Sequence, residues 1–448
     1  MLKKIIGLSL FFLLLVGCST QSSPSLKGHA TGDSAVINSN SVENSPANNS
    51  NSVLVKSEVP VNSDNPPHSP QKPPTQNPSI QNPSIQNPLS QKNMAQRYDK
   101  PNCEGTGPVN FTVSPMDLAD LDYIDPMGLM IGGHVTPIDH QYYYAKSWAQ
   151  HPTTVDELRD VHVPAAGIVR EVQRMPAEYT TSNLGDYRII IDHSCTFYTI
   201  YIHLNQLSPK LQELVGKDNR NSAVLTAGEV IGKARSFDFS THNEAVSLQG
   251  FVVPEHYDGE SWKIHTVDPF DYFTEPLRTE LLKKDIRTAI PRGGKIDYDI
   301  DGKLIGNWFI KDTGGYSGKN HGEYNYWKTH LAFAPDALDP SHIIVSLGNF
   351  KGDAKQFGIK GNAPDPAVID GKSGLIKYEL QQYNYVDSSG KYIQDAHFTQ
   401  GLTAKNYDTV EGVLLVQLID KRSLKAEVFP EKTAPEVTQF VKPIIYER

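Results

Sequence analysis

Residues 184–209 read LGDYRIIIDHSCTFYTIYIHLNQLSP. The stretch contains two runs that are dense in β-branched and aromatic residues, with a short polar sequence between them. Such runs are typical of strands joined by a turn. Side chains alternate between the two faces of a strand, so Tyr201 and His203 should share one face. Ile202 and Leu204 should share the other, and if this apolar face covers the core, His203 faces a cleft.

Similar short runs, separated by Gly, Pro, Asn and Asp, continue along the chain and predict a mainly β protein. The best candidate for a helix is PLRTELLKKDIR, residues 276–287. It lies where a boundary between two domains is expected from chain length. We therefore place a first β-sheet domain at residues 101–278 and a second β-rich domain, of unknown role, at residues 288–448.

The first 18 residues, MLKKIIGLSLFFLLLVGC, predict an export signal. Two lysines precede an apolar run that is too short to favour a permanent membrane-spanning helix. The ending LVGC resembles the lipobox of bacterial lipoproteins, in which the cysteine becomes the lipidated first residue of the mature chain. The resemblance implies that Cys18 anchors the protein to a membrane of the cell envelope, on its periplasmic or extracellular side.

Residues 19–100 are rich in Ser, Asn, Pro and Gln and poor in large apolar residues, which predicts a disordered tether. The remaining residues contain 34 Lys and Arg against 46 Asp and Glu, a net charge of −12. An acidic body of this kind argues against nucleic acid as a partner.

If Cys18 is lipidated, two cysteines remain, Cys103 and Cys195. An exported protein works in an oxidising compartment, where an even pair of cysteines can form a disulfide. The alternative is two free thiols, and the sequence leaves both open.

Four segments in order resemble the scaffold of the lysostaphin/LytM-type peptidoglycan endopeptidases. They are HVPAAGIVREVQR (162–174), the opening stretch 184–209, LTAGEVIGKA (225–234) and HTVDPFDYF (265–273). The resemblance implies a β-sheet domain of the duplicated-hybrid-motif kind, with a cleft that holds zinc. Its implied substrate is a peptide bond in peptidoglycan cross-bridges.

The segment MIGGHVTPIDHQYYY, residues 130–144, resembles the first ligand motif of that family, a histidine followed four residues later by an aspartate. His134 matches the histidine, but Asp139 lies five residues on. A turn at Pro137 would still let the two side chains converge. His140 is a rival ligand, since imidazole binds zinc well. His203 matches the histidine of the family's YxHL strand, which assists the zinc-bound water.

The sequence departs from the family at SFDF, residues 236–239, where two histidines are expected. Asp238 could supply the third metal ligand, since carboxylates bind zinc. Ser236 cannot replace an imidazole as a base near neutral pH. The segments 145–160 and 247–263 are insertions relative to the family pattern, and such loops could narrow a cleft.

Three functions agree with these residues. The first is a divergent, inactive relative that binds peptidoglycan or a cell-envelope protein and regulates at the cell wall. The second is an active zinc metallopeptidase that cleaves peptidoglycan cross-bridges. The third is a divergent metal enzyme on the same scaffold. We favour the first because both histidines of the 236–239 segment are absent.

The lipobox resemblance gives a direct test. Cys18→Ala should remove the fatty-acid label that the wild-type chain acquires in a bacterial host, because the cysteine thiol is the acylated group. Metabolic labelling followed by membrane fractionation measures this, with Ser19→Ala as a control that keeps the cysteine. Undiminished labelling of Cys18→Ala would show that the anchor lies elsewhere.

Overall fold

The computed structural model describes residues 103–148, 154–176, 184–217, 222–319, 325–393 and 400–448. The predicted signal (1–18) and tether (19–100) lie outside these residues. Within the described ranges, the short helices all fall below the length and apolar character that crossing a membrane requires.

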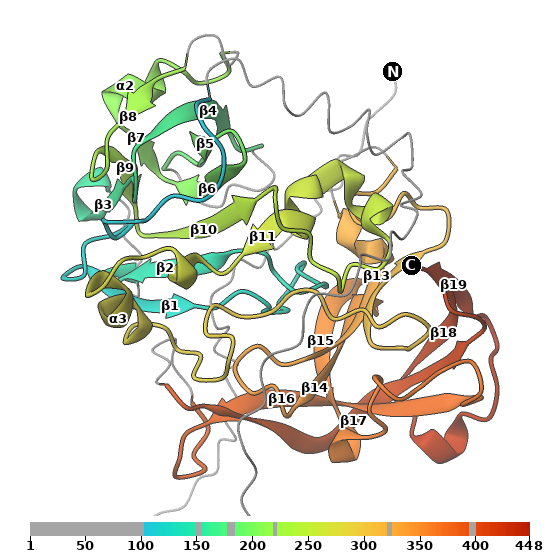
Figure 1. Ribbon diagram of the computed structural model, residues 1–448. Helices are drawn as coiled ribbons and strands as arrows, with labels where there is room; N and C mark the ends of the chain where they lie inside the picture. Colours follow the sequence, from blue (N-terminus) through green and yellow to red (C-terminus); the bar gives the residue numbers. More distant parts are fainter. Residues whose placement is uncertain (1–102, 149–153, 177–183, 218–221, 320–324, 394–399) are drawn as a thin grey trace, which may run out of the picture. The chain divides into compact units, whose positions relative to one another are not determined.

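The first half of the described chain forms two antiparallel sheets (Figure 1). The larger sheet has the order β1-β2-β10-β6-β5-β4-β8, with β11 paired to β10, and the smaller has the order β3-β9-β7. The strands are β1 (Leu121–Asp125), β2 (Gln141–Ala145), β3 (Arg159–His162), β4 (Gly167–Arg174), β5 (Tyr187–Ser194), β6 (Phe197–Leu204), β7 (Gln206–Leu207), β8 (Val224–Leu225), β9 (Val230–Ala234), β10 (Ser236–Asn243) and β11 (Thr266–Val267).

Helices in this half are short. They are the α-helices α2 (Pro209–Gln212) and α3 (Leu277–Leu282), and the 3-10 helices η2 (Val155–Glu157), η5 (Pro254–His265) and η6 (Pro269–Asp271). The helix predicted at 276–287 is therefore present only as α3, because the chain leaves the helix after Leu282 and Ile286 instead pairs its backbone with Ile124 of β1.

The two faces of strand β10 differ in character. One face is part of the apolar core and the other is polar. Phe237 and Phe239 are buried in the main core, where their rings pack against Tyr143 of β2 and Tyr201 of β6. The alternation of the strand then turns Asp238 to the opposite face of the sheet. The apolar residues of β10 thus fix which way its aspartate points.

The second half forms a closed antiparallel barrel, drawn in orange and red in Figure 1. Each strand pairs with its sequence neighbours, and β12 closes the barrel by pairing with β19. The strands are β12 (Gly306–Ile310), β13 (His330–Pro335), β14 (Ile343–Phe350), β15 (Asp353–Ile359), β16 (Ile376–Val386), β17 (Thr403–Leu418), β18 (Ser423–Pro430) and β19 (Ile444–Glu447). Short 3-10 helices η7 (Tyr326–Thr329), η8 (Lys360–Asn362) and η9 (Ala434–Glu436) lie between them. The prediction of a mainly β chain is confirmed, and the duplicated hybrid motif in the first domain stays a prediction.

A buried tryptophan and a buried arginine stack on each other in the barrel half of the chain. Trp308 is fully buried, and its Nε1 donates to the carbonyl oxygen of Leu304 at 2.7 Å. The guanidinium of Arg448 lies 4.0 Å from the centre of the Trp308 ring and pairs with Asp299 at 3.2 Å. Because both charged side chains are almost fully buried, each depends on the other for compensation.

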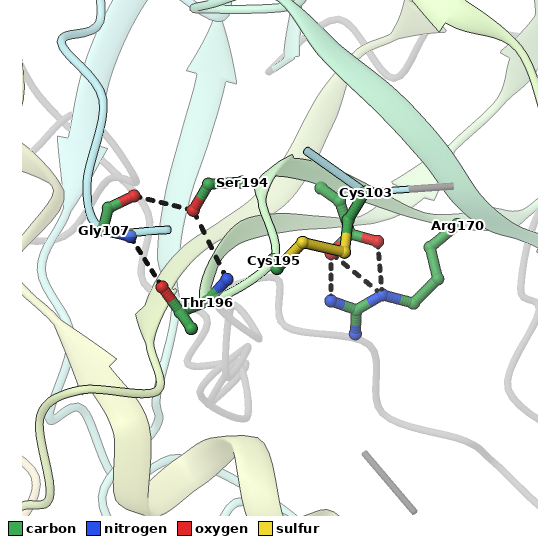
Figure 2. Close-up of a disulfide and its surroundings, with 7 residues drawn as sticks. Cys103, Gly107, Arg170, Ser194, Cys195 and Thr196 are labelled. Carbon is green, nitrogen blue, oxygen red and sulfur yellow. Dashed lines mark hydrogen bonds and ion pairs between the residues drawn. A yellow bond between two sulfur atoms is a disulfide. The ribbon is translucent and has the colours of Figure 1, made fainter. Parts of the chain in front are cut away.

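Cys103 and Cys195 are joined by a disulfide, with their Cα atoms 5.0 Å apart (Figure 2). Cys195 lies in the turn between β5 and β6. The neighbouring residues add hydrogen bonds, in which Gly107 N donates to Thr196 Oγ1 at 2.7 Å and Ser194 Oγ donates to Gly107 O at 2.7 Å. The segment before β1 is therefore bound to this turn by covalent and polar contacts.

The Arg448–Asp299 pair predicts a large effect of a single substitution. Arg448→Met should lower the free energy of unfolding by about 3 kcal/mol, because it leaves the Asp299 carboxylate buried without its cation. Denaturant unfolding measures the change. Lys421→Met is the control, since Lys421 is a mostly exposed lysine with an aspartate partner, and it should cost less than about 1 kcal/mol. Equal effects of the two substitutions would contradict this account of the barrel.

Candidate functional site

The polar face of β10 is centred on Asp238, which is only 4% exposed. The pairing register places Asp238 opposite Tyr142 on β2 and Ile202 on β6. Further along the same face of β10 is His242, which is fully buried. Its Nε2 is 2.8 Å from Ser240 Oγ and its Nδ1 is 3.0 Å from Trp262 O, so both ring nitrogens already have partners. We therefore assign His242 a structural part and Asp238 the centre of the site.

A β-bulge brings His203 to this face. Between the pairs Tyr187–Leu204 and Ile189–Tyr201, strand β6 has one more residue than β5. Within the bulge, His203 has a φ of 71°. A non-glycine residue in this left-handed region is uncommon, and bulges are known to re-aim single side chains at functional sites. The bulge turns the His203 ring toward Asp238.

The strand alternation predicted for β6 was wrong at this point. Tyr201, which was expected on the cleft face, is fully buried in the same core as Leu204. Ile202 instead lies beside Asp238 on the polar face, outside that core. In an unbroken strand His203 would follow Tyr201 into the core. Its side chain reaches Asp238 only because the extra residue breaks the alternation.

The His203 imidazole lies between two carboxylates. Its Nδ1 is 3.1 Å from both carboxylate oxygens of Asp186, and its Nε2 is 3.7 Å from Asp238 Oδ2. Burial lowers the pKa of His203, but the charges of Asp238 and Asp186 outweigh it and raise the pKa to about 9. The side chain is 41% exposed, more than the other side chains that contact Asp238 in the described part of the chain.

His140 has the same arrangement on the other side of Asp238. Its Nδ1 is 3.1 Å from Asp139 Oδ1, and its Nε2 is 3.3 Å from Asp238 Oδ2. No hydrogen-bond partner among the described residues satisfies this buried Nε2. The second oxygen of Asp139 pairs with Lys263 Nζ at 3.2 Å. Burial alone would raise the pKa of Asp139, but Lys263 and His140 hold it well below its usual value.

His134 stands next to His140, with ring centroids 5.7 Å apart. Burial is the main cause that lowers the pKa of His134, to about 3, and the neighbouring His140 lowers it further. The imidazole is therefore neutral at physiological pH and can offer a lone pair to an electrophile. It is presented by a tight turn in which Ile131 and His134 exchange both backbone hydrogen bonds, at 3.1 and 2.9 Å.

The structure thus brings His134, Asp139, His140, His203 and Asp238 together. Their order differs from the expectation in one respect, because His140 stands directly beside Asp238. Asp139 contacts His140 and not Asp238. It orients the His140 ring and pairs with Lys263.

Sequence reasoning missed two charged members of the site, Asp186 and Lys263. Asp186 directly precedes β5, whose first residue Tyr187 pairs with Leu204, so the strand register alone could have placed it beside His203. Lys263 belongs to the 247–263 insertion, and the sequence does not predict where this insertion lies in the fold. A second residue of that insertion, Glu260, is half-buried, and burial is the main cause that raises its pKa to about 7.

Imidazole and carboxylate are a donor set that suits zinc. Donor atoms around a tetrahedral zinc at about 2.0–2.1 Å lie roughly 3.3 Å from each other. The 3.3 Å contact of Asp238 with His140 is close to this separation. Even so, no group of three or more such side chains within the described ranges already converges on one point. A metal would therefore require the side chains of the cluster to move from this arrangement.

No family model and no curated protein matches the sequence. Among solved structures, the chain is similar to one described as the SpoIIQ-SpoIIIAH pore forming complex, with a TM-score of 0.24 and 12% identity over 38% of this chain and 96% of that one. It is also similar to a zinc containing peptidase from Vibrio cholerae, with a TM-score of 0.21 and 20% identity over 30% of this chain and 37% of that one. Both likenesses are too weak to carry an argument about function.

The charges around His203 predict how its titration responds to substitution. Asp238→Asn and Asp186→Asn should each lower the pKa of His203 from about 9, because the carboxylates of both aspartates raise it. NMR titration of the ring proton measures both shifts. The ring of His193, which contacts neither aspartate, is the internal control. A His203 pKa that is unchanged in Asp238→Asn would show that the two groups are not in contact.

Proposed function

We propose that this chain is a cell-envelope lipoprotein whose first domain is a divergent relative of the LytM-type peptidases, and that it binds or regulates at the cell wall without cleaving it. In this proposal, the cluster around Asp238 takes one divalent metal ion, with zinc as the ion that its ligands suit. Peptidoglycan or an envelope protein is the partner.

The closure of the cluster is the observation that carries the proposal. Asp139, His140 and Asp238 are 6%, 7% and 4% exposed, respectively. Structural zinc sites are closed by protein ligands, whereas catalytic sites keep one position open for water and substrate. A scissile peptide bond needs access that these three side chains do not give.

The two positions that the family resemblance assigns to water activation, Ser236 and His203, also offer no base for a proton from water. Ser236 stands where the family resemblance requires an imidazole, and its hydroxyl is not a base near neutral pH. Both ring nitrogens of His203 face carboxylate oxygens, from Asp186 and Asp238. His203 is therefore placed to donate hydrogen bonds and not to accept a proton from water.

A bound metal would be held by His140, Asp238 and His134. The ion would supply a positive charge that compensates the buried carboxylate. Asp139 orients the His140 ring through Nδ1, and Asp186 does the same for His203. Carboxylates in such positions fix the ring and raise the basicity of its other nitrogen. The Nε2 of His140, which faces Asp238 Oδ2 at 3.3 Å without a hydrogen bond, is the atom that this arrangement offers to the ion.

The active zinc metallopeptidase is the second candidate, and one observation favours it. The His203 side chain is 41% exposed and lies next to Asp238, so the cluster has one side open to solvent. A divergent metal enzyme with another substrate would use the same opening. Both alternatives require a metal with a free position on the His203 side.

The predicted N-terminal signal and tether suggest where the protein is located. A lipidated Cys18 would anchor the chain in a membrane, and the predicted tether of about 80 residues would span roughly 50 Å on average. That reach would let the folded part contact peptidoglycan while the anchor stays in the bilayer.

Metal binding and hydrolysis can be tested on the same samples. Metal-free protein titrated with Zn²⁺ in a calorimeter should bind one equivalent. His140→Ala and Asp238→Asn should each weaken binding at least about tenfold, since each removes a donor from the cluster. His162→Ala is the matched control, because His162 is a histidine of β3 that contacts Gly228 and Asp117 and not the cluster.

The zinc-loaded wild type should sediment with purified, dye-labelled peptidoglycan and release no dye. Failure to bind zinc would remove the metal from the proposal. Dye release that His203→Ala abolishes would establish the metallopeptidase in its place.

A further inference from the structure

The outer surface of the barrel contacts the turn that carries His134, residues 131–134. Met130, just before the turn, packs against Ala332 and Ala334 of β13 and Ile344 of β14. These side chains point away from the barrel core and are nevertheless 0–1% exposed. Two of the three are alanines, so the backbone of the turn can come close to the strands. This part of the barrel surface is therefore an interface with the first domain.

Gln356 of β15 holds the turn through its backbone. Its Oε1 accepts from Gly132 N at 3.0 Å, and its Nε2 donates to Gly132 O at 3.0 Å. The same Nε2 donates to Ser346 Oγ at 3.1 Å, which fixes the orientation of the amide. One side chain thus satisfies both polar backbone groups of a residue two positions before His134. Gly132 has a φ of 54°, so a residue with a side chain would be strained at this point.

Trp327 of η7 covers the next residue of the turn. A Cβ atom added to Gly133 would lie 3.0–3.3 Å from three atoms of the Trp327 ring, so the indole is in close contact with the glycine backbone. The ring and the Gln356 amide hold consecutive residues, Gly133 and Gly132. The turn therefore has little freedom to rotate His134 away from the site.

The connection between β12 and β13 also touches the other end of the His134–His140 segment. The Tyr316 ring lies 4.5 Å from Lys263 Nζ, and Lys263 pairs with Asp139. Asp139 in turn orients the His140 ring. Contacts from the barrel half thus reach both histidines of the segment, one through the turn and one through the lysine.

We propose that the barrel is a positioning element of the site, and that Gln356 and Trp327 hold the Gly132-Gly133-His134 turn so that the His134 imidazole faces the cluster around Asp238. The inference rests on the proposed function for its metal readout only. The order of the turn is a separate property, which can be measured without any metal.

The test compares Gln356→Leu with Gln417→Leu in the full chain. Gln417 is another half-buried glutamine of the barrel wall, on β17, with no bond to the turn. In metal-free protein, hydrogen exchange of the peptide that covers residues 129–135 should be faster by about tenfold in Gln356→Leu and unchanged in Gln417→Leu. Gln356→Glu keeps an acceptor for Gly132 N and loses the donor, so it should fall between the two.

The metal readout then asks whether the turn matters for the site. Zinc affinity should fall by about tenfold in Gln356→Leu and in Trp327→Ala, and Gln417→Leu should match the wild type, at similar melting temperatures for the two glutamine variants. Unchanged exchange in Gln356→Leu would overturn the proposal, whatever the metal data show. Faster exchange in a protein whose wild type binds no zinc would keep the positioning role and reject the metal. Faster exchange with unchanged zinc affinity would reduce Gln356 to a purely structural residue and overturn the positioning role.

Discussion

The burial of one carboxylate, that of Asp238, constrains the arrangement of the larger sheet around it. Asp238 sits in the middle of a sheet because the phenylalanines on either side of it belong to the core, and the pleat of β10 then leaves its side chain no other direction. A buried carboxylate needs positive charge or hydrogen-bond donors nearby. The imidazoles of His140 and His203 lie beside Asp238. The other ring nitrogen of each contacts a second aspartate, which orients the ring. The remaining features of the site follow from this need.

The same need links segments that are far apart in the chain. His140 comes from the loop before β2 and His203 from the end of β6, and Lys263 comes from η5. Lys263 neutralises the aspartate behind His140 and itself lies on the ring of Tyr316, which precedes β13. Charge compensation around a single residue thus brings together both halves of the described chain.

The sequence predicted the β class well and the site in part. Dense runs of Ile, Tyr and Phe mark most strands, and the order Phe237-Asp238-Phe239 agrees with the direction of Asp238 because β10 is regular from Ser236 to Asn243. Alternation failed for His203, because a bulge is an extra residue and leaves no mark in the pattern of residue types. Asp139 and His140 could not be ranked, since their order depends on which one meets Lys263. The closed barrel was not predicted, because closure depends on pairing between β12 and β19. These strands lie at opposite ends of the second half, and local sequence patterns do not show such long-range pairing.

The covalent bond between Cys103 and Cys195 has a mechanical consequence for a chain anchored at Cys18. In the proposed lipoprotein, a pull on Cys18 would reach the disulfide at Cys103 before it reaches the residues between Cys103 and β1. The disulfide passes that force straight to the turn between β5 and β6, two strands that lie inside the larger sheet. The exposed residues 104–106, which directly follow Cys103, would be bypassed and would not peel away first. Tension from the membrane would therefore be resisted by interior strands of the sheet. One of these strands, β6, is the strand that presents His203.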